Sequence, residues 1–491
     1  MKFMSFLKNI SYLSFLVTVP VFSQGYEISI SLNSRNDTVM LGHYFTKSDL
    51  KIPDDTLVLK NGKGVFRGGK VLEKGVYFLI NDRKLLFDFI IGDNKKFGIV
   101  ADTADFINLT KFTNSPENDV FSDFQHFNVD RGKQFQQLNE EYKNATSDDV
   151  RSVILTKIQE LREERIKYIE KLVDANKGLY VSKFLRTLVP PETYLPEPPK
   201  DDQGNITDPG FQYRWFRTHF FDNLDIFDPD MLRTPFYEEK LMDYMTKWIL
   251  QHPDTICAEA DKILAKAKDN DEIFKCILIP LFNYYVKSQV LVHENVWVHL
   301  ADKWYIPYST WSSDEYKETL KKEVEKKTPN LIGKPAPPME MLMILPPEHF
   351  KAAALDTAIK NDLHEGRMVQ DFRKELKSKY TAIVFWDYSC GHCKKFMEEM
   401  HEVYEEHKNN GLAVITVQTV NTREAKNKWI DYANDHQMLD WVNAWSPYHN
   451  NYRDLYDISS TPVLYLLDEK GDIILKKLQP EQIKDFIDKN K

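Results

Sequence analysis

Two cysteines stand three positions apart in the segment FWDYSCGHCKKF, at Cys390 and Cys393, with Gly391 and His392 between them. A structural zinc site needs four ligands, usually from two such pairs, and this sequence has one close pair. A disulfide across so short a loop would add little stability, because it hardly restricts the unfolded chain. The spacing therefore favours a redox centre over a metal site or a structural bond.

The elements expected around this pair would place its two thiols differently. Residues 382–386 are apolar and predict a buried strand, and a helix is expected to begin at Cys390 and to stop near Gly411. Backbone N–H groups at a helix N-terminus favour a thiolate, and a protonated His392 would favour it further. We therefore expect Cys390 to attack a partner disulfide and Cys393, one turn into the helix, to resolve the mixed disulfide.

A Thr-Pro pair, Thr461 and Pro462, stands at the start of a later apolar run, TPVLYLLD. Proline cannot donate to a strand ladder, so it suits the first residues of a strand. Two conformations remain open from these residues. The bond is either an ordinary trans bond in a loop, or a cis bond that turns backbone groups outward beside the sulfurs.

The order of these elements resembles a known family. The stretch VFWDYSCGHCKKF, a helix, a strand, YDISSTPVLYLLDEKGDI and a closing helix are similar to the thioredoxin fold. The segment IGKPAPP at residues 332–338 is similar to the opening of the exported TlpA-like thiol-disulfide oxidoreductases. The resemblance covers roughly the last third of the chain, and CxxC followed by Thr-Pro is a specific combination.

The resemblance implies a role for each residue of the site. Cys390 would be the nucleophile, Cys393 the resolving thiol and Pro462 the cis proline, with His392 as a further catalytic residue. The substrate would be bound by the residues around the pair: Trp386, Tyr388, Gly391 and Thr461.

Four positions depart from the thioredoxin pattern or bear on its chemistry. Val384 stands where thioredoxin carries a buried acid that accepts the proton of the second cysteine. Water or another group would take that proton; Glu365 and Asp387 are the candidate groups, and a solvated loop acid is the simpler interpretation of Asp387. The Gly-His dipeptide at His392 matches protein disulfide isomerase, which leaves the direction of electron flow open.

Upstream, the pattern predicts an exported chain with two further domains. Residues 1–23 have a positive start and a short apolar run, which is typical of a secretory signal peptide. Residues 25–117 contain runs of strand length separated by turns and predict an antiparallel β-sandwich. Residues 118–327 carry apolar residues at helical spacing and predict an α-helical domain, and residues 328–491 form the α/β thioredoxin-like domain.

Two local signals support these assignments. Asn61-Gly62 between two strand-like runs is a hairpin signal, and Ser147 precedes a helical pattern as an N-cap. The remaining cysteines, Cys257 and Cys276, fall in the predicted helical domain, where a disulfide and two buried free thiols are both open interpretations.

Composition limits the function further. The 491 residues carry a formal net charge of −9 and a pI near 5.9, which argues against nucleic acid as a partner. After cleavage of the signal peptide we expect no transmembrane anchor, and no cofactor or metal is expected.

Together these features predict an exported thiol-disulfide oxidoreductase in the periplasm of a Gram-negative bacterium. Its partners would be protein thiols or disulfides and an electron donor or acceptor at the inner membrane. Reduction is the first expectation, and isomerisation or oxidation the second. A non-catalytic envelope scaffold that uses the thioredoxin-like module for binding is the alternative from a different class.

Overall fold

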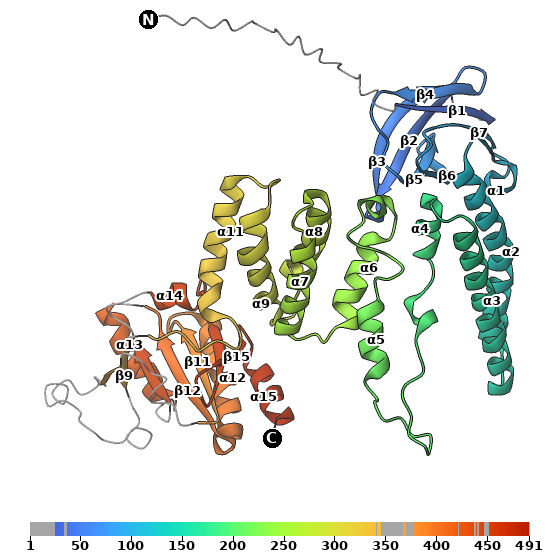
Figure 1. The fold of residues 1–491 in the computed structure, drawn as a ribbon. Coiled ribbons are helices and arrows are strands. Elements are labelled where there is room, and N and C mark those ends of the chain that lie inside the picture. The colour runs from blue at the N-terminus through green and yellow to red at the C-terminus, as the bar shows by residue number, and fades with distance from the viewer. Residues whose placement is uncertain are drawn as a thin grey trace, which may run out of the picture. The chain divides into compact units, whose positions relative to one another are not determined.

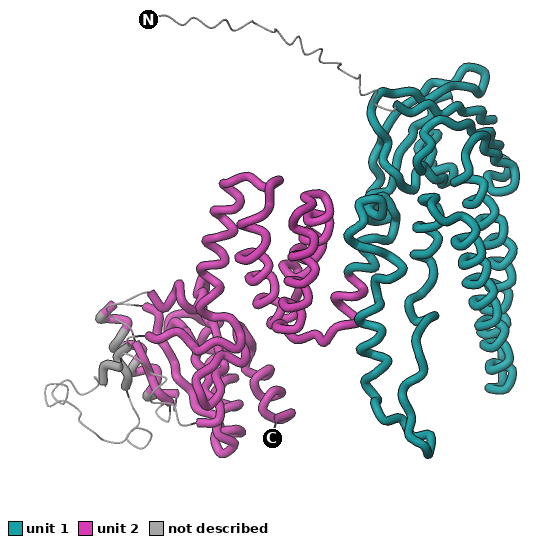
Figure 2. The backbone as a smooth tube through the Cα atoms, in the orientation of Figure 1, with its two compact units in different colours: residues 1–241 teal, residues 242–491 magenta. Residues whose placement is uncertain are grey.

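The structure, a computed structural model (Figure 1), describes residues 25–33, 37–339, 341–344, 367–369, 378–420, 422–436, 438, 441–445 and 451–490. The chain divides into two compact units, residues 1–241 and 242–491 (Figure 2). The three domains predicted from the sequence do not correspond to these two units, and their boundaries stay predictions. The expected signal peptide and Glu365 lie outside the described residues.

The first unit begins with two four-stranded sheets, in the orders β4-β1-β7-β8 and β3-β2-β5-β6. They share one apolar core, to which β1 contributes Ile28 and Ile30 and the facing sheet contributes Leu79 and Phe89. Burial alternates along β1, as expected for a strand with one face on a core. The strands are β1 (Tyr26–Asn33), β2 (Thr38–Phe45), β3 (Lys47–Val58), β4 (Lys63–Gly68), β5 (Gly75–Asn81), β6 (Lys84–Ile91), β7 (Lys96–Asp102) and β8 (Lys111–Thr113).

The prediction of an antiparallel sandwich is right for the second sheet and wrong for the first, where β1 pairs parallel with β7. The apolar alternation that predicts a strand does not encode its direction, and the long connection from β1 to β7 permits a parallel pair. Asn61 and Gly62 both have positive φ angles in a tight turn, as predicted. That turn joins β3 and β4, which belong to different sheets.

Helices complete the first unit. Ser147 caps α3 as predicted, since its hydroxyl accepts a hydrogen bond of 3.4 Å from the backbone N–H of Val150. The helix ends at Ala175, and Gly178 follows with a φ of 103°. The elements are α1 (Phe106–Leu109), α2 (Pro116–Asn144), α3 (Asp148–Ala175), α4 (Tyr180–Arg186), α5 (Phe211–His219), α6 (Tyr237–Asp243) and the 3-10 turns η1 (Pro191–Tyr194) and η2 (Pro229–Arg233).

The second unit starts as a helical array. Its helices are α7 (Pro253–Ala267), α8 (Asp271–Lys287), α9 (His293–Leu300), α10 (Ile306–Tyr308) and α11 (Asp314–Lys327), with the π-helical segments η3 (Tyr244–Trp248) and η4 (Ala301–Tyr305) and the 3-10 helix η5 (Thr328–Asn330). The helices α7, α8 and α9 pack on one another (Figure 1). Within the part of the chain that the structure describes, no helix has both the length and the apolar character needed to cross a bilayer.

A mixed seven-stranded sheet follows, in the order β10-β9-β13-β12-β11-β14-β15. Its inner strand β11 pairs parallel with β12 and antiparallel with β14. The elements are β9 (Met341–Ile344), β10 (Arg367–Val369), β11 (Tyr380–Trp386), α12 (Gly391–His407), η8 (Lys408–Asn410), β12 (Leu412–Gln418), α13 (Arg423–Asp435), β13 (Val442–Trp445), α14 (Tyr452–Leu455), β14 (Val463–Asp468), β15 (Ile473–Lys476) and α15 (Pro480–Lys489).

Every residue of β11 is buried, because both faces of the sheet are covered. Val384 belongs to the core that contains residues of α12 and α15, whereas Phe385 belongs to the core on the opposite face, with Tyr452 of α14. The predicted strands and helices of this region are present in the predicted order. The rigid strand β11 therefore fixes the point at which the cysteine motif begins.

Candidate active site

A tight turn carries the chain from β11 into α12. The carboxylate of Asp387 accepts hydrogen bonds from the backbone N–H of Ser389 at 2.8 Å and from its hydroxyl at 2.7 Å. The backbone N–H of Cys390 donates to the carbonyl of Asp387 at 3.1 Å. This local hydrogen bonding, typical of Asp in turns, places Cys390 at the N-cap of α12.

Cys390 is half-buried at that cap, and its environment favours the thiolate. Its pKa is lowered chiefly by a hydrogen bond from the backbone N–H of Cys393, then by contact with the Cys393 thiol and the backbone N–H of His392. Partial burial and the carboxylate of Asp387 oppose the shift. The result agrees with the predicted role of the helix N-terminus.

Cys393 has the opposite character. Its side chain is fully buried, and burial raises the pKa of its thiol to about 11. The backbone of Asp387 and the side chain of Thr461 offset part of this increase. Both thiols are free, so the structure represents the reduced pair, with one accessible sulfur favouring the thiolate and one buried sulfur favouring the thiol.

The Thr-Pro pair lies beside these sulfurs. The Thr461–Pro462 peptide bond is cis, as the resemblance implies, and β14 begins at the next residue. Both residues are half-buried, and the Thr461 side chain is a hydrogen-bond partner of Cys393. From the sequence, Thr461 was predicted only to contact the substrate. Its hydrogen bond with Cys393 joins residues far apart in the chain, and no local sequence pattern indicates this contact.

The other predicted site residues differ in accessibility. Gly391 and His392 are exposed beside Cys390, and Tyr388 is half-buried. Trp386 is fully buried, and the centroid of its ring lies 5.4 Å from that of Tyr432. The substrate contacts of these residues and the catalytic role of His392 stay predictions.

The two candidate proton acceptors were Glu365, outside the described residues, and Asp387. The Asp387 carboxylate accepts hydrogen bonds from Ser389, and the backbone of Asp387 is a hydrogen-bond partner of Cys393. Val384 is fully buried on β11, which leaves an aliphatic side chain where thioredoxin has an acid.

Of the two interpretations left open for the other two cysteines, the structure shows no disulfide between them. Neither Cys257 on α7 nor Cys276 on α8 forms a disulfide, and burial raises the pKa of Cys257 to about 12. Neither thiol belongs to the site at Cys390.

One group of side chains in the described part of the chain has ligand types and spacing suited to a metal ion: Glu406, His407 and Asp488. It lies at the end of α12 opposite the cysteine motif. The ammonium of Lys484 already pairs with the carboxylates of Glu406 and Asp488, so a cation of the protein itself lies against this group.

Comparison with known proteins agrees with this geometry. Residues 378–473 match the family model described as thioredoxin-like, and residues 158–330 match a domain of unknown function (DUF5106). The chain is 26% identical over 120 residues to sporulation thiol-disulfide oxidoreductase A of Bacillus subtilis, covering 24% of this chain and 72% of that protein.

Two solved structures illustrate the range of similarity. A thioredoxin-like protein from Bacteroides caccae is 16% identical, with 61% of this chain and 99% of that chain covered and a TM-score of 0.37. The thioredoxin domain of a thiol-disulfide oxidoreductase from Bacteroides vulgatus is 20% identical, with 32% of this chain and 96% of that chain covered and a TM-score of 0.25. The C-terminal region is thus a thioredoxin-like domain, related to thiol-disulfide oxidoreductases and preceded by a DUF5106 region.

Proposed function

We propose that this protein is an exported thiol-disulfide oxidoreductase that reduces disulfide bonds of other envelope proteins. The observation that carries the proposal is the opposite environment of two neighbouring thiols. The pKa of Cys390 is lowered at the cap of α12, while that of Cys393 is raised to about 11 in the core. A nucleophile beside a shielded second thiol is the arrangement that two-step disulfide exchange requires.

In the proposed reaction, the Cys390 thiolate attacks one sulfur of a partner disulfide. That S–S bond breaks, a mixed disulfide forms on Cys390, and the departing partner sulfur takes up a proton. Cys393 then loses its proton and attacks the Cys390 sulfur, which releases the second partner thiol. Two electrons pass to the partner, and Cys390 and Cys393 end as a disulfide that an external dithiol must reduce again.

Export rests on residues 1–23 alone, whose positive start and apolar run are typical of a signal peptide. The periplasm would supply protein disulfides as substrates, and an electron donor at the inner membrane would return the pair to its dithiol form. Fractionation of cells that produce the full chain tests this part: the mature protein should be released with the periplasm and should have lost about 23 residues.

The direction of electron flow is the main alternative. His392 is exposed beside Cys390, and the Gly-His dipeptide favours a less reducing pair, as in an isomerase or oxidase. Equilibration with glutathione separates these functions. A potential near that of thioredoxin, about −270 mV, supports a reductase, and one near or above about −180 mV supports an isomerase or oxidase.

Trapping of partners tests the whole class. The variant Cys393→Ala should hold substrates as mixed disulfides on Cys390 when it is mixed with envelope extract, and reduction should release them. The double variant Cys390→Ala/Cys393→Ala is the matched control. If the double variant captures the same proteins, binding does not depend on thiol exchange. The protein would then be a non-catalytic scaffold and not a thiol-disulfide oxidoreductase.

A further inference from the structure

A buried carboxylate lies at the junction between the helical array and the thioredoxin-like sheet of the second unit. Asp457 is 5% exposed and contacts three ammonium groups. Lys326 and Lys327, at the end of α11, approach its two oxygens at 2.7 Å and 2.6 Å, and Lys477, directly after β15, completes the set. These contacts hold the pKa of Asp457 well below its usual range, against the opposing effect of burial.

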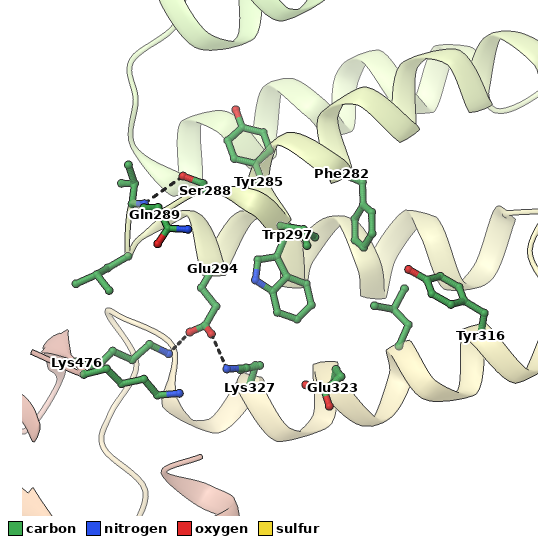
Figure 3. A pocket seen from close by; sticks show the side chains of 15 residues that line it. Phe282, Tyr285, Ser288, Gln289, Glu294, Trp297, Tyr316, Glu323, Lys327 and Lys476 are labelled. Carbon is green, nitrogen blue, oxygen red and sulfur yellow. Dashed lines mark hydrogen bonds and ion pairs between the residues drawn. The ribbon is translucent and has the colours of Figure 1, made fainter. Parts of the chain in front are cut away.

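A second carboxylate joins the same lysines. Figure 3 shows Glu294 of α9 between Lys327 and Lys476, and the Lys327 ammonium lies 3.1 Å from it. Lys476 is 2% exposed and also donates to the carbonyl and the side-chain oxygen of Asn330, each at 2.9 Å. Helices α9 and α11 are therefore tied to β15 and to the loop at Asp457 by charge-assisted hydrogen bonds, in which Asp457 and Lys476 are buried.

The position of Asp457 in the chain connects this network to the active site. Asp457 lies four residues before Thr461, and Leu464 lies three residues after Thr461. The Lys477 side chain contacts Asp457, and its backbone N–H donates to the Leu464 carbonyl at 2.6 Å. Lys477 thus holds both ends of the segment that presents Thr461 to Cys393.

We propose that Lys326 and Lys327 are positioning residues for the second step of disulfide exchange. By fixing Asp457 they fix the segment that holds the Thr461 side chain against the sulfur of Cys393. This inference rests on the proposed function and deepens it, because it makes the helical array part of the redox machinery. Neither lysine touches the reacting sulfurs, so their effect passes through Thr461.

The chemistry predicts which step should respond. Cys393 must lose a proton before it attacks the mixed disulfide, and the hydrogen bond from Thr461 favours its thiolate. Cys390 takes its stabilisation chiefly from the backbone N–H of Cys393 in α12, and the Cys393 thiol contributes less. Loss of the two lysines should therefore slow resolution and leave the first attack unchanged.

The test is a single-turnover reaction of the full chain with oxidised glutathione, with acid quenching and mass measurement of the mixed disulfide. In Lys326→Met/Lys327→Met, attack on glutathione should stay within about twofold of the unmodified protein, since Cys390 is untouched. Resolution at pH 7 should slow about five- to tenfold, the value of one hydrogen bond, and its pH profile should move to higher pH.

Two matched variants separate positioning from general stability. Lys321→Met/Lys322→Met removes two exposed charges from the same helix α11 and should leave both steps unchanged. Lys326→Arg/Lys327→Arg keeps the charges and should restore resolution. If the Met pair does not fold, Lys326→Met alone removes one of the three cations at Asp457 and should show a smaller slowing of the same step.

The outcomes are distinguishable. Equal slowing of both steps, or an unchanged resolution rate in a folded variant, overturns the positioning role while the proposed function stands. An unmodified protein that does not exchange with glutathione overturns the proposed function, and the positioning role with it.

Discussion

Two cysteine pairs in the same compact unit differ in chemistry, although all four thiols are free. Cys390 is the N-cap of α12, where backbone N–H groups reach its sulfur and lower its pKa. Cys257 lies beyond the first turn of α7, where such groups already serve the helix. Burial, followed by the carboxylates of Asp261 and Asp254, raises the pKa of Cys257 to about 12.

The comparison teaches that the position of Cys390 at a helix N-terminus makes the largest contribution to lowering its pKa, and that the neighbouring thiol of Cys393 makes a smaller one. Cys393 and Cys276 are both buried, but only Cys393 lies one turn from a thiol whose pKa is lowered. A buried cysteine outside a disulfide generally packs as a small apolar side chain.

The sharpest test of this difference is the loss of each nucleophile. Cys390→Ser should reduce the rate of disulfide reduction by roughly a thousandfold, because a hydroxyl cannot form the mixed disulfide. Cys257→Ser should leave the rate within about twofold. Insulin turbidity, measured with a chemical dithiol as electron donor, compares the two variants directly, and comparable losses would contradict the comparison.

Alkylation by iodoacetamide as a function of pH should rank the thiols. The pKa of Cys390 is lowered, so its rate should reach half its maximum below the ordinary thiol pKa and persist as pH falls toward neutrality. Cys257 and Cys393, with pKa values of about 12 and 11, stay protonated at pH 7 and should react at least about a hundredfold more slowly. Peptide mass mapping assigns each modification, and early labelling of Cys257 would refute the ranking.

Stability should respond in the opposite sense to activity. Cys276 is 8% exposed in α8, so Cys276→Ala removes a buried sulfur and should lower the free energy of unfolding by about 1 kcal/mol. Cys390→Ala, at a half-buried cap, should cause no measurable loss. Urea unfolding followed by circular dichroism gives both values, and a larger loss for Cys390→Ala would reverse the assignment of roles.

The smallest effect is expected between the two catalytic cysteines. A Cβ atom added to Gly391 would meet no atom within 4 Å, and its φ is not in the left-handed region. Gly391→Ala should therefore change the rate of exchange with glutathione by less than about twofold. A larger effect would mean that a partner chain approaches the backbone at Gly391, which would support the predicted role of Gly391 in substrate binding.

Much of the redox site follows from short-range sequence patterns. The apolar run of β11, the turn at Asp387 and the helix from Gly391 are recognisable locally, and together they place Cys390 at a helix cap. The capping role of Ser147 was predictable for the same reason. Such features depend on hydrogen bonds between residues a few positions apart, so their neighbours in sequence are enough to specify them.

Other features depend on tertiary structure alone. Local alternation could not indicate that β1 pairs parallel with β7, because both directions satisfy the same apolar pattern. No spacing joins Thr461 to Cys393, or Lys327 to Asp457, since these contacts form only when separate elements pack together. The sequence thus determined which residues could carry redox chemistry, whereas packing decided how deeply Cys393 is buried and which distant residues hold its surroundings in place.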